Sequence, residues 1–219
     1  MRAVPIVDLS HVIVDGMTTY PGLPGPIISD HLSREDSRSR YAEGYEFQIG
    51  HIDMVSNTGT YLDTPFHRFA DGHDLAGLDP ARVTNVPGVL IDATGGQTAG
   101  TDLLDGIDVA GRAVLFRTGW DRHWGTAAYG DPSHPYLAVA TAELLVGRGA
   151  AVVGIDSVNI DDTAGGARPI HTILLGAGVP IVEHLCNLDR LVGETFTFTA
   201  LPPAIEGVGT FPVRAIAIS

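Results

Sequence analysis

Side chains that can carry acid–base or metal chemistry are concentrated between residues 51 and 67. The polar members of this stretch are His51, Asp53, Asn57, Thr60, Tyr61, Asp63 and His67. Alternate side chains of an extended backbone share a face, so we expect Tyr61 and Asp63 to point the same way. Bends at Gly59 and Pro65 could bring the flanking polar groups to the same small volume. A turn network in which these groups only satisfy the nearby backbone fits the spacing equally well.

A second pair of candidates, His171 and Glu183, lies in the sequence PIHTILLGAGVPIVEH. His171 is near the start of an expected short helix, and Glu183 ends the apolar strand that follows. An ionised glutamate is costly to bury there unless it is paired or bound to a metal. The two side chains could therefore meet at one site. The alternative is a surface glutamate and a histidine that only caps the helix.

We expect little chemistry from most of the other histidines. The ones expected in loops or on the surface are His11, His31, His73, His123 and His134. His184 should face away from Glu183 if the strand continues through both residues. Asp156 and Asn159 end a buried strand, where ligand sites of α/β proteins often lie, and are weaker candidates.

The charge of the chain excludes several classes of function. The 219 residues include 26 Asp and Glu against 13 cationic residues, all of them Arg, which gives a net charge of −13. Such an acidic chain has no basic footprint for nucleic acid or for an anionic membrane surface. The absence of Lys excludes Schiff-base chemistry through a lysine amine. A small-molecule substrate is therefore the expected partner.

Short Val- and Ile-rich runs between Gly, Pro and Asp turns predict an α/β fold with more strands than helices. The expected strands cover residues 4–9, 47–55, 88–91, 113–117, 151–155, 180–182, 195–199 and 213–218. Thr141 should cap a helix that ends at Gly149, and Pro169 should open a helix that ends at Gly176 or Gly178. Runs such as AVVGI do not alternate, which is typical of strands buried on both faces of a mixed sheet. No linker-like stretch divides residues 1–219, so one compact domain is expected.

Residues 57–67 read N-x-G-T-Y-x-D-x-P-x-H. This sequence resembles the H-x-G-T-H-x-D-x-P-x-H motif of the cyclase family of metal-dependent hydrolases, which includes bacterial kynurenine formamidase (arylformamidase) and isatin hydrolase. Other segments resemble the family in the same order, namely VDLSHVI, YPG, LFRTGW, VVGIDSVNID, IHTILLGAGVPIVEHLCNL and GTFPVRAIAI. The resemblance implies a compact α/β domain of the swivelling β/β/α type with a mixed sheet. It also implies a homodimer or homotetramer.

The resemblance assigns roles position by position. In two-metal members, one metal is held by both motif histidines, the motif aspartate and a later glutamate. The other metal is held by the same aspartate, a later histidine and the same glutamate. The matching residues here are Asn57 and Tyr61 for the two histidines, Asp63 for the aspartate, His171 for the later histidine and Glu183 for the glutamate. His67 matches the proposed proton shuttle, and Tyr20 matches an aromatic residue of the substrate loop.

Asn57 and Tyr61 depart from the family pattern and leave two outcomes open. Asn offers only a neutral oxygen, and Tyr with a usual pKa of ~10 is a poor ligand near neutrality. The first outcome is one divalent metal on Asp63, His171 and Glu183, with Asn57 as a weak fourth donor. Such an oxygen-rich set favours Mn²⁺ or Mg²⁺, with Zn²⁺ also expected to fit. The second outcome is a metal-free acid–base cluster in which one carboxyl has a raised pKa.

The resemblance predicts a hydrolase that cleaves a C–N bond of a small aromatic amide, formamide or lactam, as in kynurenine-type metabolism. His67 would move the proton, and Tyr20, Trp120 and Arg168 would bind the substrate. A metal-independent cyclase, dehydratase or isomerase of a secondary metabolite is the alternative, with Tyr61 as the acid and His67 or Asp63 as the base. A binding module that has lost the chemistry is a third hypothesis.

The sequence also predicts a cytoplasmic location. The single Cys186 cannot form an internal disulfide, which favours a reducing compartment. The first residues lack the apolar core of a signal peptide, and no apolar run reaches the ~18 residues of a membrane-spanning helix.

Overall fold

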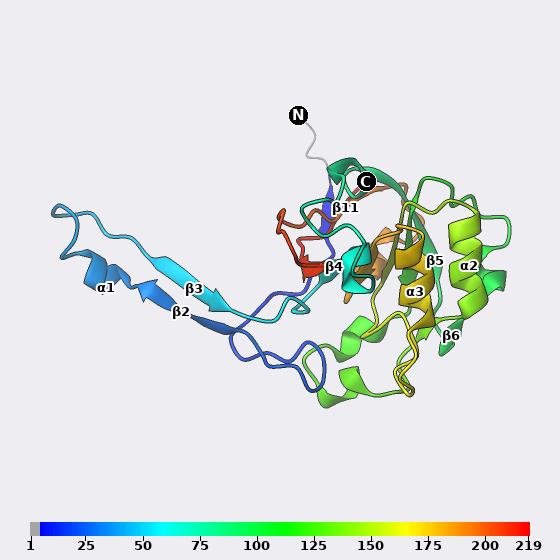
Figure 1. Ribbon diagram of the computed structural model, residues 1–219, viewed down its shortest axis with the longest axis horizontal. Coiled ribbons are helices and arrows are strands. Elements are labelled where there is room, and N and C mark those ends of the chain that lie inside the picture. The colour runs from blue at the N-terminus through cyan, green and yellow to red at the C-terminus, as the bar shows by residue number, and fades with distance from the viewer. Residues whose placement is uncertain (1–4) are drawn as a thin grey trace.

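A nine-stranded mixed sheet forms the centre of the computed structural model, which describes residues 5–219 (Figure 1). Its strands are β1 (Ile6–Asp8), β4 (Tyr61–Asp63), β5 (Val86–Asp92), β7 (Ala113–Arg117), β9 (Val152–Ile155), β10 (Ile181–Glu183), β11 (Thr197–Thr199), β12 (Thr210–Pro212) and β13 (Ile216–Ile218). Their order is β1-β13-β11-β5-β7-β9-β10-β4-β12. The central strands β5, β7, β9 and β10 run parallel, and the outer strands pair antiparallel. The expected mixed α/β sheet, with strands outnumbering helices, is confirmed; Val4 of the first expected strand lies outside the described residues.

Both faces of this sheet are buried. Along β7, Ala113 and Leu115 belong to one hydrophobic core while Val114 and Phe116 belong to the other. On the second face, helices α2 (Val139–Gly147) and α3 (Pro169–Gly176) lie side by side over the central strands (Figure 1). The non-alternating apolar runs of the sequence are explained by this double burial.

The two main helices differ in how well their starts were predicted. α3 begins at Pro169 as expected, where the missing backbone N–H of proline costs nothing. α2 begins at Val139, with Ala138 at the N-cap, so the prediction that Thr141 caps this helix is wrong. Thr141 lies buried inside the first turn, and its hydroxyl donates a hydrogen bond to the carbonyl oxygen of Ala99 at 2.9 Å.

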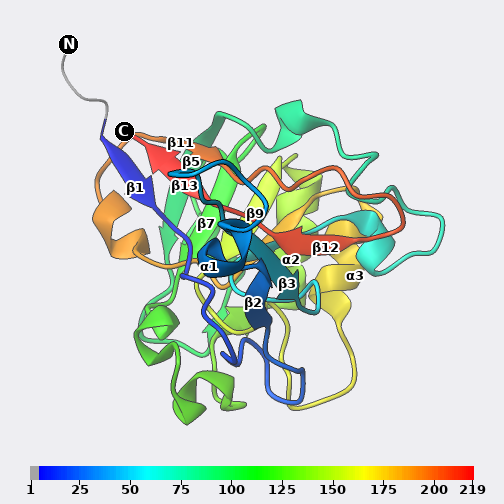
Figure 2. The same cartoon turned by 90° about the vertical axis from the view of Figure 1, so that its left-hand side faces the viewer.

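A long arm projects from the rest of the molecule (Figure 1). It spans residues 27–53 and consists of β2 (Ile27–Leu32), the short helix α1 (Arg34–Ser37) and β3 (Ile49–Asp53). β2 and β3 form an antiparallel ribbon, which points at the viewer in Figure 2. The sequence predicted a strand here but not that it would leave the compact body. A small two-stranded parallel sheet, β6 (Thr98–Ala99) with β8 (Tyr136–Leu137), completes the fold.

Candidate active site

β4 places two polar side chains inside the molecule, between strands β10 and β12. Tyr61 lies opposite Glu183 of β10, and Asp63 lies opposite Thr210 of β12. All four residues are buried, whereas Leu62 between them packs into a hydrophobic core. The expectation that Tyr61 and Asp63 share one face is thereby met, and strand register explains their meeting with Glu183.

Asp63 and His67 are linked through the hydroxyl of Thr210. This hydroxyl donates a short hydrogen bond to Oδ1 of Asp63 and lies 2.7 Å from Nδ1 of His67. The other carboxylate oxygen of Asp63, Oδ2, is buried with no hydrogen-bond partner among the described residues. Burial alone would raise the pKa of Asp63, but the nearby imidazoles of His67 and His171 and the Thr210 hydroxyl lower it below its usual range.

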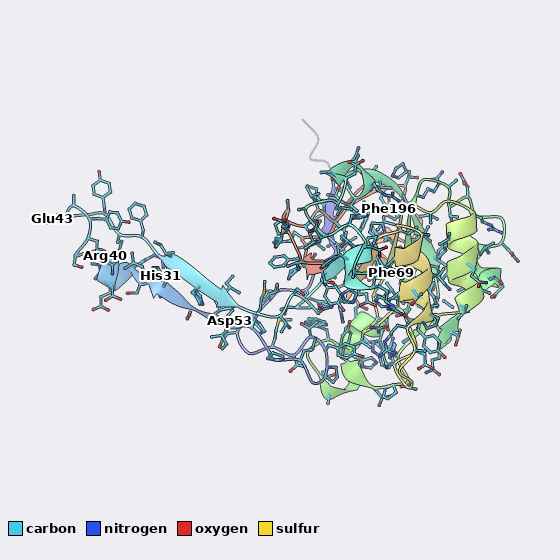
Figure 3. The ribbon with its side chains drawn as sticks, in the orientation of Figure 1. His31, Arg40, Glu43, Asp53, Phe69 and Phe196 are labelled. Carbon is cyan, nitrogen blue, oxygen red and sulfur yellow. The ribbon has the colours of Figure 1, made fainter. Side chains whose placement is uncertain are left out.

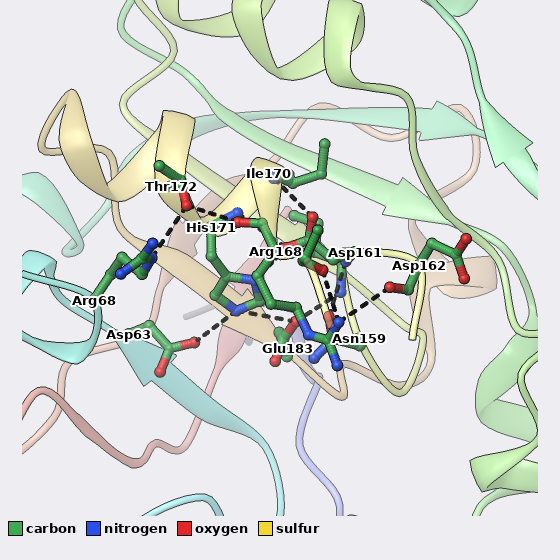
Figure 4. A network of polar contacts seen from close by, with 12 residues as sticks. Asp63, Arg68, Asn159, Asp161, Asp162, Arg168, Ile170, His171, Thr172 and Glu183 are labelled. Atoms are coloured by element: carbon green, nitrogen blue, oxygen red, sulfur yellow. Dashed lines mark hydrogen bonds and ion pairs between the residues drawn. The ribbon is translucent and has the colours of Figure 1, made fainter. Parts of the chain in front are cut away.

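His171 is held by the buried carboxylate of Asp161. One oxygen of Asp161 accepts from the Ile170 backbone N–H at 2.7 Å, and the other accepts from the His171 backbone N–H at 3.0 Å and from Nδ1 at 2.6 Å. These bonds cap the N-terminus of α3 and leave Nε2 of His171 facing the other carboxylates, 3.8 Å from Asp63 Oδ2 and 3.6 Å from Glu183 Oε1 (Figure 4). Burial alone would lower the pKa of His171, but Glu183, Asp161 and Asp63 together raise it to about 10.

Glu183 is fully buried at the end of β10 and is held by two donors. The Tyr61 hydroxyl donates to Oε2 at 2.7 Å, and the Ile160 backbone N–H donates to Oε1 at 2.7 Å. Burial raises the pKa of Glu183 to about 7 against the lowering effect of His171. Burial and the charges of Glu183 and Asp63 raise the pKa of Tyr61 well above 10. Tyr61 is therefore a neutral phenol whose proton is engaged by Glu183.

A cavity of about 380 Å³ is lined by four residues of this cluster, namely Tyr61, His67, His171 and Glu183. Of the expected substrate-binding residues, Tyr20 and Arg168 line it, and so does Asn57. Nη1 of Arg168 donates to the carbonyl oxygens of residues 162, 165 and 167 at 2.7–3.2 Å, which fixes the guanidinium at the cavity wall. Trp120 does not line the cavity, because its indole N–H donates to the Tyr129 carbonyl at 2.9 Å in a neighbouring loop.

Comparison with known proteins identifies the family. A family model described as a putative cyclase matches residues 7–162. The chain belongs to this cyclase family. Kynurenine formamidase of Bacillus cytotoxicus is 28% identical over 217 residues, which cover 99% of this chain and 98% of that protein.

Solved structures support the same assignment. An isatin hydrolase bound to the product analogue thioisatinate superimposes with a TM-score of 0.84 at 25% identity, covering 99% of this chain and 92% of that one. A structure described as a potential metal-dependent hydrolase with cyclase activity gives a TM-score of 0.79 at 25% identity, with 99% and 98% coverage.

The cyclase-family metal positions fit this chain only in part. Asp63, His67 and His171 each offer an atom within 4.8 Å of the others, so a divalent cation can be held here. Within residues 5–219, Asp63 Oδ2 has no hydrogen-bond partner, and Nε2 of His171 lies 3.8 Å from it and 3.6 Å from Oε1 of Glu183. Nδ1 of His67, in contrast, is engaged by Thr210. At the metal position that the two motif histidines would form, the protonated Tyr61 donates to Glu183 and cannot serve as a ligand in that state.

Sequence patterns did not single out every residue that the structure places at or near the site. Asp161 and Thr210 were not singled out, although the run VNIDD after a buried strand was a usable signal for Asp161. Asn159, a weaker candidate, lines the cavity. His134 lies in a loop, as expected, but it is fully buried there and not at the surface.

Other polar residues lie away from the cavity. His184 is buried with a left-handed backbone (φ 57°), and its Nδ1 lies 2.8 Å from the Tyr129 hydroxyl. His51 and Asp53 are exposed on the arm and take no part in this cluster. Asp156 is buried and accepts three hydrogen bonds from Thr118 and Gly119.

Proposed function

We propose that this protein is a hydrolase that cleaves the C–N bond of a small aromatic amide, formamide or lactam. The observation that carries the proposal is the convergence of an unpartnered carboxylate oxygen of Asp63, Nε2 of His171 and the Glu183 carboxylate beside His67 at a cavity. The names of the relatives, kynurenine formamidase and isatin hydrolase, support this substrate class.

One divalent cation, Mn²⁺ or Zn²⁺, would be held by Asp63, His171 and Glu183. When bound, such a cation polarises the carbonyl of the substrate and lowers the pKa of a water molecule. Asn57 lines the same cavity and offers its side-chain oxygen as a weak additional donor.

The side chains around this position divide the remaining work. His67 is half-exposed at the cavity and accepts a proton from the attacking water, then returns it to the leaving nitrogen. Tyr61 holds Glu183 in place through its hydroxyl. Tyr20 offers an aromatic face to the ring of the substrate, and the anchored guanidinium of Arg168 can accept an anionic substituent.

Hydrolysis of formanilide and ring opening of isatin, each followed by absorbance, test this function. The wild type with Mn²⁺ should convert at least one of them, and His67→Ala should lower kcat by roughly 10²- to 10⁴-fold. His31→Ala, which removes an exposed imidazole from the arm, is the matched control and should keep wild-type activity. No turnover of either compound would contradict the proposal.

Exhaustive chelation tests whether the proposed hydrolysis depends on a bound cation. Activity should disappear when the cation is removed and return when Mn²⁺ or Zn²⁺ is restored at about one ion per chain. Full activity after chelation would refute the cation and leave the acid–base cluster to act alone.

We further propose that a second copy of this chain covers the arm. Large apolar side chains are exposed along it, namely Ile27, Ile28, Tyr41, Tyr45, Phe47, Ile49 and Ile52. The arm holds its side chains, those of His31 and Arg40 among them, away from the compact body of the chain (Figure 3). A two-stranded ribbon is at best marginally stable alone, so a permanent partner is needed. A second copy is present wherever this chain is. It also offers an apolar groove of about 880 Å³, lined by Val12, Val14, Met17 and Trp124, against which the arm can pack reciprocally.

The molar mass in solution tests this contact. Ile52 on the arm and Val192 on the body are almost equally exposed, at 57% and 58%. Ile52→Asp should shift the protein from dimer or tetramer toward monomer in light scattering, whereas Val192→Asp should not. A monomeric wild type would contradict the proposal.

A further inference from the structure

Thr210 lies buried between two site residues and touches both through one hydroxyl. Its Oγ1 contacts Oδ1 of Asp63 and lies 2.7 Å from Nδ1 of His67, whereas the direct distance between Asp63 Oδ1 and His67 Nδ1 is 3.8 Å. The hydroxyl therefore connects two groups that do not hydrogen-bond directly.

A hydroxyl has one proton to donate, and this fixes the direction of both hydrogen bonds. An ionised Asp63 has no proton and can only accept, so the Thr210 hydroxyl must donate to it. A cation on Oδ2 would leave this requirement unchanged, since a carboxylate that binds a cation carries no proton. The remaining lone pair of Oγ1 faces His67, and so Nδ1 of His67 must carry a hydrogen. In the neutral ring, Nε2 is then the unprotonated nitrogen.

We propose that Thr210 is a positioning residue that holds neutral His67 in the Nδ1–H tautomer, so that Nε2 is left as the base at the cavity. The inference rests on the proposed function in one respect, namely that His67 is the base. When water gives a proton to Nε2, the ring becomes an imidazolium while both hydrogen bonds, from Nδ1 to Oγ1 and from Oγ1 to Oδ1, stay in place. The negative charge of Asp63 then stabilises the imidazolium through one hydroxyl.

The local backbone keeps Thr210 in this position. The carbonyl oxygen of Gly209 accepts from the Thr64 backbone N–H at 2.8 Å and from its hydroxyl at 3.0 Å. A Cβ at Gly209 would overlap the backbone N of His67, so only glycine allows this approach. The chain just before β12 is thus held against the turn that carries His67. Thr210, the residue after Gly209, is therefore held beside His67 as well.

NMR of ¹⁵N-histidine-labelled protein tests the tautomer without any substrate. His67 signals are assigned by their loss in His67→Gln, and the spectra are recorded over a range of pH so that the neutral form of His67 is identified by its own ¹⁵N shifts. The wild type and Thr210→Ser should show the hydrogen on Nδ1, whereas Thr210→Val should move His67 toward the Nε2–H form. Thr141→Val is the matched control, because Thr141 is also buried with one hydroxyl bond but lies on α2. It should leave the His67 signals unchanged.

Kinetics give the second readout. Thr210→Val should lower kcat roughly 10- to 100-fold with little change in KM, and Thr210→Ser should restore most of it. A wild-type His67 with its hydrogen on Nε2, or an Nδ1–H tautomer that persists in Thr210→Val, would overturn the inference. If the wild type hydrolysed no aryl amide, the proposed function would fail while the NMR result for Thr210 would still decide this inference.

Discussion

Replacement of Asp161 by Asn tests whether this buried carboxylate organises the site through His171. The substitution keeps the shape of the side chain and removes its charge. Three N–H donors point at the two carboxylate oxygens, at 2.6–3.0 Å. An amide has one oxygen, so its NH₂ group must face at least one of these donors without a bond.

The expected loss follows from those three bonds. A hydrogen bond to a charged group contributes about 1.5–3 kcal/mol, and an unsatisfied buried donor costs about 1–3 kcal/mol. One or two of the bonds can survive on the amide oxygen, so we expect Asp161→Asn to lower the free energy of unfolding by about 3 kcal/mol. For a chain of this length, that is a decrease in Tm of roughly 6–12 °C. Because the orientation of His171 loosens, affinity for Mn²⁺ should fall about 10- to 100-fold.

Chemical denaturation and calorimetric titration with Mn²⁺ measure both effects. Asp162→Asn is the control, since the neighbouring Asp162 is exposed and its carboxylate accepts, among the described residues, only the Ala164 backbone N–H at 2.9 Å. It should change stability by no more than about 0.5 kcal/mol and leave Mn²⁺ binding unchanged. Equal stability and equal affinity for Asp161→Asn and the wild type would refute the role of Asp161.

Three further predictions concern protons, packing and metal number. The folded state raises the pKa of His171 from 6.5 to about 10 and that of Glu183 from 4.5 to about 7, so it binds both protons more tightly than the unfolded state. The cation-free protein should therefore lose stability in urea as pH rises from about 4.5 to 10. His171→Gln should make the decline between about pH 7 and pH 10 shallower, because this part comes from His171; a wild type that gained stability over the whole range would contradict the assignment. Gly154→Ala should lower the free energy of unfolding by about 1–3 kcal/mol, because the added Cβ would lie 2.7 Å from Leu185 and 2.8 Å from Leu115. The control Gly147→Ala, at the exposed end of α2, adds a Cβ with no neighbour within 4 Å and should be neutral or stabilising. Equal melting temperatures for the two variants would show that the core adapts to the added methyl group. Asn57→His combined with Tyr61→His restores the two histidines of the motif that residues 57–67 resemble, and it should raise bound metal in elemental analysis from about one ion per chain toward two. An unchanged ratio would mean that a second metal position needs more than these two ligands.

The sheet was predictable because the residues of its central strands are buried on both faces. A run such as AVLF in β7 carries this signal locally, and the apolar stripe of α3 with Pro169 at its start does the same. The arm was not predictable, because residues 47–55 are as rich in apolar side chains as a strand that packs on a core. Only the tertiary structure reveals that no core of this chain receives their apolar side chains.

The site was predictable where one short segment sets its geometry. Tyr61 and Asp63 are two residues apart on one strand, so their common face follows from strand periodicity. Thr210 comes from a strand 147 residues later in the chain than Asp63, and only the pairing of β4 with β12 brings the two together. Local spacing contains no information on such a pairing. The burial of the loop residue His134 was not predictable for a similar reason, since the side chains that contact its ring nitrogens, Ser157 and Thr163, come 23 and 29 residues later in the chain.

The substitution of Tyr for a motif histidine changes how the charge of Glu183 is balanced. A second cation beside Glu183 would bring two positive charges to its carboxylate, whereas the phenol of Tyr61 brings one hydrogen bond and no charge. The remaining positive charge near Glu183 is His171, 3.6 Å away, or a cation that replaces its proton. Proton and cation therefore compete for one position between Asp63, His171 and Glu183. Because His171 and Glu183 hold protons more tightly than usual, cation binding must release them, and affinity for Mn²⁺ should rise with pH. A cation affinity that did not change between pH 6 and pH 8 would show that the cation does not displace these protons.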